Sequence, residues 1–405
     1  MMLQSVLTSL ALAGGASAAA ATTRVLVPEL TGPHEVGTTV LELIDYGRED
    51  PFAPTPQPRD LLISLYYPTE DTYHHRSGGC KLAPQFPPKQ AAYYDAVFNS
   101  SAPIAELLTT RSCVGAPLTR PDLPLLLFGP GLGTSRQLYA DFAGEMASHG
   151  WNVVTVDHPY DTDFIEYPDG RVVQTSDSPA AQNATLDQFL DVRVQDLIFV
   201  LDALANSSVT SLIPGLGGDG HSGSSGGAKY PTGNPTPQKK NKLRTDKVGC
   251  LGHSFGGAAS LQLMSSDALK RCVVGSNLDG GLYGPVVQQG TNLPFLFFGR
   301  ADHTLQTDDT WTEAWKHLTG FKRMYAVTGI LHADYSDIPL LDQALGSRSP
   351  DVLKGLHGNL TGTRMLEIQT GFLGALFGRF LEGEKGALLD EKVLKGWPEV
   401  TRLEA

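Results

Sequence analysis

The chain has 405 residues, of which 41% are hydrophobic and 18% are charged, so it can bury a sizeable core and is not a disordered protein. The 31 Lys and Arg residues against 43 Asp and Glu residues give a formal net charge of −12. This balance disfavours both nucleic acid and an anionic membrane surface as partners. The length is compatible with two or three domains or with one large α/β domain.

The first 23 residues carry no charged side chain. An apolar stretch from Leu3 to Ala13 is followed by small residues with an A-x-A cleavage pattern at Ala16 to Ala18. This order is typical of a secretory signal peptide, and we predict one over residues 1–20 and a secreted, extracellular protein. Because Lys and Arg are missing near Met1, an Ala-rich disordered tail is the alternative. The stretch is shorter than the ~20 apolar residues that a membrane-spanning helix needs.

Two further features agree with secretion. Asn-x-Ser/Thr sequons, which are potential glycosylation sites, occur at Asn99, Asn183, Asn206 and Asn359. The four cysteines form an even set without a C-x-x-C spacing, and we favour a disulfide between Cys80 and Cys113. Cys250 and Cys272 each lie in a run that looks like a buried strand, so they form either a second disulfide or two small hydrophobic side chains in the sheet.

Apolar runs typical of buried strands recur along the chain. They cover residues 61–67, 123–128, 151–156, 248–251, 272–278, 293–298 and 323–327. Helix-like stretches lie between most of them, and this alternation predicts a mostly parallel central sheet with helices on both faces. The predicted fold class is therefore α/β.

Two helices and one long loop complete the predicted domain. The helix over residues 186–204 carries an apolar stripe that we expect to face the core, formed by Leu186, Leu190, Leu197, Leu201 and Leu204. The helix over residues 365–381 should pack on the sheet. Residues 214–245 are rich in Gly, Ser, Pro and Lys and predict a solvated, flexible loop. We expect this loop to interrupt a single domain over residues 24–400.

The strongest functional signal is a Gly-x-Ser-x-Gly motif formed by Gly252, Ser254 and Gly256. It follows an apolar strand and precedes a helix-like run, which is the context of the nucleophile elbow of α/β-hydrolases. Glycines are needed two residues either side of the serine because side chains there would collide with neighbouring backbone. A second match around Ser225 lies in the predicted loop with no strand before it, so its context rejects it.

A serine nucleophile needs a histidine base and an acid that orients it. In α/β-hydrolases the histidine comes last in the chain, and His332 stands shortly after the last predicted strand. We expect His253 to point away from Ser254 and His303 to be a surface or polar-cluster residue. For the acid, Asp279 and Asp302 both follow strands between the serine and the histidine, and the residues alone leave both open.

Two backbone N–H groups should stabilise the developing oxyanion. One is the N–H of Phe255, directly after the nucleophile. For the other we choose Leu132, in the glycine-rich turn Gly129 to Gly133 after a predicted strand. This turn lacks the Lys-Ser/Thr ending of a phosphate-binding P-loop. With neither an H-E-x-x-H motif nor an EF-hand loop, no metal and no cofactor are expected.

Several segments resemble the secreted platelet-activating-factor acetylhydrolases of the lipoprotein-associated phospholipase A2 type. In the family's order they are Leu62 to Pro68, Leu127 to Gly133, Ala147 to Trp151, Val156 to His158, Gly252 to Gly257 and Leu278 to Asp279. The resemblance runs from about residue 60 to 382, and Pro130 departs from it where the family usually has histidine. It implies a calcium-independent α/β-hydrolase that cleaves short or oxidised sn-2 acyl chains from phospholipids. As partners we expect a phospholipid or other small ester substrate and peripheral contact with a lipid surface.

The resemblance also bears on the acid and on the alternatives. It favours Asp279, because the family takes its acid from the end of the strand after the elbow helix; Asp302 would then cap the helix that contains Trp311. The enzyme alternatives are a general carboxylesterase and a polyester hydrolase, which share the elbow. A catalytically silent hydrolase-like binding protein is the alternative outside enzymes.

Overall fold

The computed structural model describes residues 24–70, 80–217 and 242–403. The predicted signal peptide and residues 218–241 of the predicted loop lie outside these ranges. Arg244 and Thr245, at the end of that predicted loop, belong to a strand instead.

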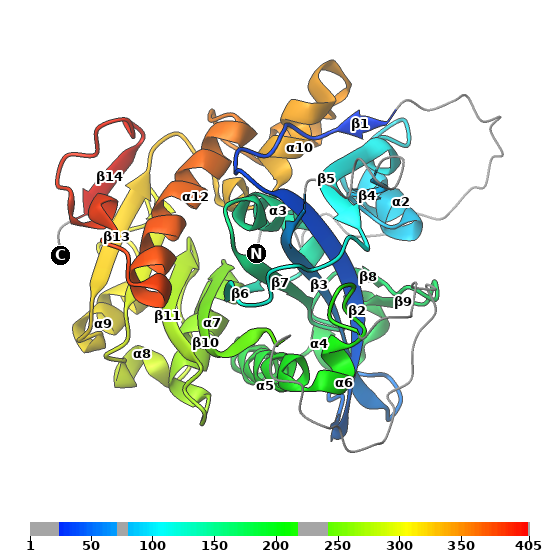
Figure 1. The fold of residues 1–405 in the computed structure, drawn as a ribbon, viewed down its shortest axis with the longest axis horizontal. Helices are drawn as coiled ribbons and strands as arrows, with labels where there is room; N and C mark the ends of the chain where they lie inside the picture. Colours follow the sequence, from blue (N-terminus) through cyan, green and yellow to red (C-terminus); the bar gives the residue numbers. More distant parts are fainter. Residues whose placement is uncertain (1–23, 71–79, 218–241, 404–405) are drawn as a thin grey trace.

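A mostly parallel sheet forms the centre of the molecule (Figure 1). Neighbouring parallel strands run in the order β7–β6–β10–β11–β12–β13. Their bounds are β6 (Pro124–Gly129), β7 (Asn152–Asp157), β10 (Arg244–His253), β11 (Cys272–Leu278), β12 (Phe295–Arg300) and β13 (Lys322–Val327). Every residue of β6 and β7 is buried, as expected for strands covered on both faces. The prediction of an α/β fold with a mostly parallel sheet is confirmed.

The sheet continues on both sides in strands that the sequence pattern only partly revealed. The flanking strands are β1 (Val25–Leu26), β2 (Glu35–Glu49), β3 (Pro58–Thr69), β4 (Leu82–Pro84), β5 (Leu108–Val114) and β14 (Val400–Leu403). β3, which was predicted, pairs antiparallel with both β2 and β7, and β14 pairs antiparallel with β13. β2 has exposed and buried residues interspersed, so it lacks the continuous apolar run by which buried strands are found. A separate hairpin joins β8 (Phe164–Glu166) to β9 (Val172–Gln174).

Helices cover both faces of the sheet and create two hydrophobic clusters. One cluster contains residues of α2 (Pro88–Val97), α3 (Ala140–Ser148), α10 (Ile338–Leu345), α11 (Asp351–Lys354) and α12 (Gly362–Phe377). The other contains residues of α4 (Pro179–Gln182), α5 (Leu186–Ala205), α6 (Ser207–Thr210), α7 (Phe255–Ser266), α8 (Val286–Gln289) and α9 (Asp309–His317). None of the described helices is long and apolar enough to cross a membrane.

Both predicted helices are present. α5 begins after a capping box of Thr185 and Gln188 and buries the predicted leucine stripe from Leu190 onward. Leu186 was wrongly placed in the core: it is 37% exposed, because it is the first helical residue and precedes the turn that contacts the sheet. α12 ends at Phe377 and continues into a π-helical turn.

The cysteines of the described residues form two disulfides. Cys80 is bonded to Cys113, which confirms the favoured pairing and ties the segment before β4 to β5. Cys250 is bonded to Cys272, so of the two alternatives the structure has the disulfide, which links the neighbouring strands β10 and β11.

Candidate active site

Ser254 lies at the sharp turn between β10 and α7. Its φ of 54° and ψ of −125° are strained for a residue with a side chain, and its N–H donates to Leu278 O at 2.8 Å. The two glycines of the motif are required by space. A Cβ on Gly252 would come within 2.3 Å of the Gly256 carbonyl carbon, and one on Gly256 within 1.9 Å of Gly129 O. The backbone therefore has the geometry that the motif predicted.

The segments that flank Ser254 come from the carboxyl ends of parallel strands, which meet at one edge of the sheet. β10 lies between β6 and β11. The turn after β6 begins at Pro130, and Asp279 follows β11 directly with a φ of 58°. His332 begins a 3₁₀ turn a few residues after β13. The predicted site residues thus gather from distant parts of the chain.

His332 and Asp279 form a hydrogen-bonded pair. His332 Nδ1 lies 2.6 Å from Asp279 Oδ2. Burial alone would raise the pKa of Asp279, but hydrogen bonds from His303 and His332 outweigh it and hold that pKa well below its ordinary value. Asp279 is therefore ionised and can orient His332, whose side chain is 47% exposed toward solvent.

Asp302, the other candidate acid, does not approach His332. Its side chain is 76% exposed, and its carboxylate pairs with Arg300 at 3.5 Å. The expectation that it caps the following helix is wrong: Asp308 is the N-cap of α9 and accepts from the N–H groups of Thr310 and Trp311. Asp302 lies too early in the connecting turn to reach the first helical N–H groups.

Ser254 and His332 are not joined by a hydrogen bond in the described part of the chain. In ligand-free active sites this bond is often long and tightens when substrate binds. Two contacts nevertheless bring the pair into one site. The ring of His332 lies 4.5 Å from the ring of His253, the residue before Ser254, and Ser254 N is bonded to Leu278 O, one residue before Asp279.

The glycine-rich turn after β6 lies against the nucleophile. A Cβ on Gly131 would lie 3.5 Å from Ser254 Cβ. The N–H of Gly131 is already used, because it donates to Tyr139 Oη at 3.2 Å. The next N–H along the chain belongs to Leu132, the residue chosen from the sequence.

The direction of the Leu132 N–H is set by its own peptide plane. In a trans peptide the N–H of Leu132 points opposite to the carbonyl of Gly131. That carbonyl accepts from Arg193 Nη2 at 3.0 Å and from Thr134 Oγ1 at 2.9 Å. The N–H of Phe255, at the first position of α7, has no acceptor within the helix. The Phe255 N–H therefore lies directly after Ser254 at the start of α7, and the bonds to the Gly131 carbonyl fix the direction of the Leu132 N–H.

Arg193 on α5 is a site residue that the sequence analysis missed. It is buried, pairs with Asp161 through Nε at 2.6 Å, and donates to Pro130 O through Nη1 at 2.5 Å. Its guanidinium also lies over the Phe255 ring, 5.0 Å from the centroid. A signal was present, because a charged residue three positions after Leu190 falls on the predicted apolar stripe.

The two neighbouring histidines have different surroundings. His253 Nδ1 lies 2.8 Å from Tyr139 Oη, and burial, with the nearby charge of His332, brings the pKa of His253 well below its ordinary value. His253 is thus neutral and packs beside the catalytic turn. His303 belongs to a polar cluster, one of its two predicted environments, but it is largely buried between Asp279 and Asp308.

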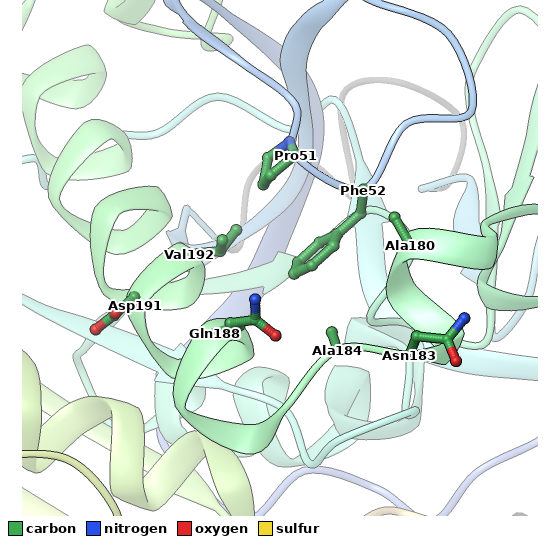
Figure 2. Close-up of a pocket in the computed structure, with 8 residues that line it drawn as sticks. All are labelled: Pro51, Phe52, Ala180, Asn183, Ala184, Gln188, Asp191 and Val192. Carbon is green, nitrogen blue, oxygen red and sulfur yellow. The ribbon is translucent and has the colours of Figure 1, made fainter.

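A cavity of about 320 Å³ lies apart from the candidate active-site residues. It lies between the β2–β3 connection, α4 and the start of α5, and the Phe52 ring points into it between Gln188 and Ala180 (Figure 2). Asn183, one of the sequon residues, is at its rim. Neither Ser254 nor Asp279 is among its lining residues. Within the described residues no group of three or more His, Cys, Asp or Glu side chains is arranged to hold a metal.

Comparisons with known proteins identify the family of this chain. The profile of the family "Platelet-activating factor acetylhydrolase, isoform II" matches residues 19–169 and 232–368, more than half of the chain. The chain is 29% identical, over 97% of its length and 98% of the relative's, to a probable 1-alkyl-2-acetylglycerophosphocholine esterase of Arthroderma benhamiae. It is 24% identical to the platelet-activating factor acetylhydrolase of Cavia porcellus, over 77% of this chain and 69% of that protein.

A solved structure extends the likeness to the whole fold. The ferulic acid esterase from Streptomyces cinnamoneus superposes with a TM-score of 0.72 at 27% identity, covering 95% of this chain and all of that one. These matches confirm the predicted α/β-hydrolase fold and the predicted esterase class. The chain belongs to the platelet-activating factor acetylhydrolase isoform II family.

Proposed function

We propose that this esterase uses Ser254 as its nucleophile, His332 as its general base and Asp279 as the acid that orients His332. The observation that carries the proposal is the strained Ser254 at the end of β10, beside an Asp279–His332 pair at 2.6 Å on the same edge of the sheet. Strained backbone at a strand-to-helix turn is retained where it positions a reactive side chain.

The geometry leads to a two-step reaction. His332 Nε2 takes the proton of Ser254 Oγ as that oxygen bonds to the ester carbonyl carbon, and the N–H groups of Phe255 and Leu132 stabilise the resulting oxyanion. Protonated His332 then gives the proton to the departing alcohol as the ester C–O bond breaks. In the second step His332 takes a proton from a water molecule as the water oxygen bonds to the acyl carbon. The bond to Ser254 Oγ then breaks, and His332 returns the proton to Ser254. Asp279 remains ionised throughout and stabilises the imidazolium.

For the substrate we propose glycerophospholipids with a short sn-2 acyl chain, with acetyl as the leading case. Family membership and the 1-alkyl-2-acetylglycerophosphocholine esterase named among the relatives support this choice. Hydrolysis of an acyl series from acetyl to long chains on one glycerophosphocholine scaffold measures the preference. Activity that rises with chain length would contradict the proposal.

Ser254→Ala is the direct test of the nucleophile. We expect loss of ester hydrolysis and of covalent labelling by a fluorophosphonate probe, with the fold retained, because the change removes one hydroxyl and little packing. Ser265→Ala is the matched control, since Ser265 lies in α7 and its hydroxyl bonds to Gln262 of the same helix. A Ser254→Ala protein that still shows burst-phase acylation would refute the assignment.

A general carboxylesterase is the second candidate, and the likeness to a ferulic acid esterase supports it. A comparison of kcat/KM for an acetylated glycerophospholipid and for methyl ferulate separates the two. A polyester film assay covers the related polyester hydrolases. Absence of both turnover and probe labelling in the wild-type protein would favour the binding-protein alternative.

We further propose that the protein is secreted and glycosylated. The two disulfides of the described residues support an oxidising compartment, and all four sequon asparagines are exposed. Treatment of the natively expressed protein with a peptide N-glycosidase should lower its mass. Contact with lipid surfaces stays a proposal that co-sedimentation with phosphatidylcholine vesicles can test.

A further inference from the structure

His303 lies in the turn between β12 and α9 and bridges two carboxylates. Its Nδ1 is 2.8 Å from Asp279 Oδ1, and its Nε2 is 2.8 Å from Asp308 Oδ2. His332 is bonded to the other oxygen of Asp279, Oδ2. The acid beside the catalytic histidine is therefore held between two imidazole rings.

The bonding pattern determines the charge of His303. An ionised carboxylate only accepts hydrogen bonds, so a histidine bonded to two of them must donate from both ring nitrogens and is an imidazolium. Burial opposes this charge, but the bonds to Asp279 and Asp308 prevail and raise the pKa of His303 to about 9. The ring also stacks on Trp311 with centroids 4.0 Å apart.

The partners of His303 are themselves anchored. Asp308 is fixed as the N-cap of α9, and Trp311 donates through Nε1 to Gly280 O, next to Asp279. Arg300, at the end of β12, donates its backbone N–H to Asp279 Oδ1 at 3.0 Å and brings its Nε within 3.1 Å of Oδ2. His303 thus belongs to a rigid chain of contacts that runs from the start of α9 to the acid.

Other titratable groups surround this series of contacts. Asp302 lies on the same turn with its side chain in solvent. Tyr283 faces Asp308, where burial and that charge raise its pKa. His332 approaches from the turn after β13. Among these titratable groups, His303 is the one bonded to Asp279 Oδ1, the oxygen that also accepts from the Arg300 N–H.

We propose that His303 is a positioning residue for Asp279: its Nδ1–H aims the carboxylate at His332, and its positive charge limits how strongly that carboxylate stabilises protonated His332. The inference rests on the proposed triad of Ser254, His332 and Asp279. It makes two separable predictions, one for the hydrogen bond and one for the charge.

Two substitutions separate these contributions. In His303→Asn the amide nitrogen stands near the position of Nδ1 and keeps the donor to Asp279 while removing the charge. In His303→Gln the amide nitrogen stands near Nε2 and keeps the donor to Asp308, while the bond to Asp279 and the charge are both lost. Loss of the charge should move the acidic limb of the kcat/KM profile to higher pH by roughly 0.5–1.5 units in both variants.

The hydrogen bond distinguishes the two variants in kcat. We expect kcat of His303→Gln to fall about tenfold or more with little change in KM, because a misaimed acid misplaces the base. His303→Asn should retain most of kcat. The substrate for these measurements is 4-nitrophenyl acetate, assayed from pH 5 to 10 together with the melting temperature of each variant. His317→Gln is the control, since His317 is also at α9 but pairs with Glu313 at 3.0 Å.

The outcomes decide whether His303 positions Asp279 for catalysis or only stabilises the fold. A shifted acidic limb in both variants, with kcat lower in Gln than in Asn, supports the proposal. An unshifted limb and equal kcat values, with only the melting temperature lowered, would overturn it. If the glutamine variant does not fold, His303→Asn alone tests the effect of the charge, and an unmoved acidic limb in that variant also overturns the proposal. Failure of the triad itself would show separately, as hydrolysis retained in Ser254→Ala.

Discussion

The two turns beside Ser254 are held by different kinds of bond. On the β11 side, Asp279 is surrounded by His303, His332 and Arg300. On the β6 side, the carbonyls of Pro130 and Gly131 are held by Arg193, and Tyr139 accepts from the Gly131 N–H. We call these the acid side and the oxyanion side.

The difference predicts where pH acts. A guanidinium does not lose its proton in proteins, and burial raises the pKa of Tyr139 to about 12, so the oxyanion side keeps one charge state across the working range. The acid side contains two histidines on one carboxylate. The oxyanion hole can thus stay constant while the acid–base pair responds to pH. We therefore expect substitutions on the acid side to displace the pH profile of activity, and substitutions on the oxyanion side to leave it in place.

The largest effect is expected on the acid side, from Asp279→Asn. Loss of the acid from a Ser-His-Asp triad costs roughly 10⁴-fold in turnover, because the histidine loses its correct tautomer and its stabilising charge. Asp302→Asn is the control and should change kcat little, since its carboxylate is exposed. Steady-state kinetics of both variants provides the measurement, and an inactive Asp302→Asn with an active Asp279→Asn would exchange the two roles.

On the oxyanion side, Arg193→Lys should cost roughly 10–100-fold in kcat. A lysine keeps a cation for buried Asp161, but its single nitrogen replaces the three guanidinium nitrogens that reach Asp161, Pro130 O and Gly131 O. The Leu132 N–H therefore loses its fixed direction. The shape of the pH profile should stay that of the wild type. A profile displaced along the pH axis would mean that Arg193 acts through His332 rather than through the oxyanion hole.

Tyr139→Phe tests the same side more gently. It removes the hydroxyl that contacts Gly131 N, Thr134 and His253. A neutral hydrogen bond contributes about 1 kcal/mol to the free energy of the folded arrangement. We expect kcat to fall about 3–10-fold, again without a displaced pH profile. A normal kcat would show that Arg193 and Thr134 hold the turn without Tyr139.

The smallest effect concerns stability and returns to the acid side. The pKa of His303 is raised in the folded protein to about 9 from an ordinary 6.5, so its bonds contribute stability that is fully present below pH 6.5 and is lost as pH rises through 9. The melting temperature of the wild type should therefore fall more between pH 6.5 and 9.5 than that of His303→Asn, by about 1–3 °C. Parallel curves for the two proteins would argue that His303 is neutral when folded.

Much of the site was predictable because its requirements are local. The run that became β10, followed by Gly252, Ser254 and Gly256, specifies a strand, a strained turn and a helix within a few residues, and only glycine fits beside that turn. The order of serine, acid and histidine, with each candidate after an apolar run, follows from the way parallel strands deliver their carboxyl ends to one edge. Residue spacing alone left Asp279 and Asp302 open, and the family resemblance favoured the residue that lies beside His332.

Other features were decided by the tertiary structure. Arg193 meets Gly131 across 62 positions and His303 meets Asp279 across 24, and neither contact has a local pattern. The long strand β2 was missed for a related reason: its stability comes from pairing with β3 rather than from a continuous apolar run. Whether a polar side chain meets a partner depends on strand order and register, which place the ends of β6, β11 and β12 beside α5 and α9. The sequence therefore determined the reactive turn, and packing between distant elements decided which charged groups surround it.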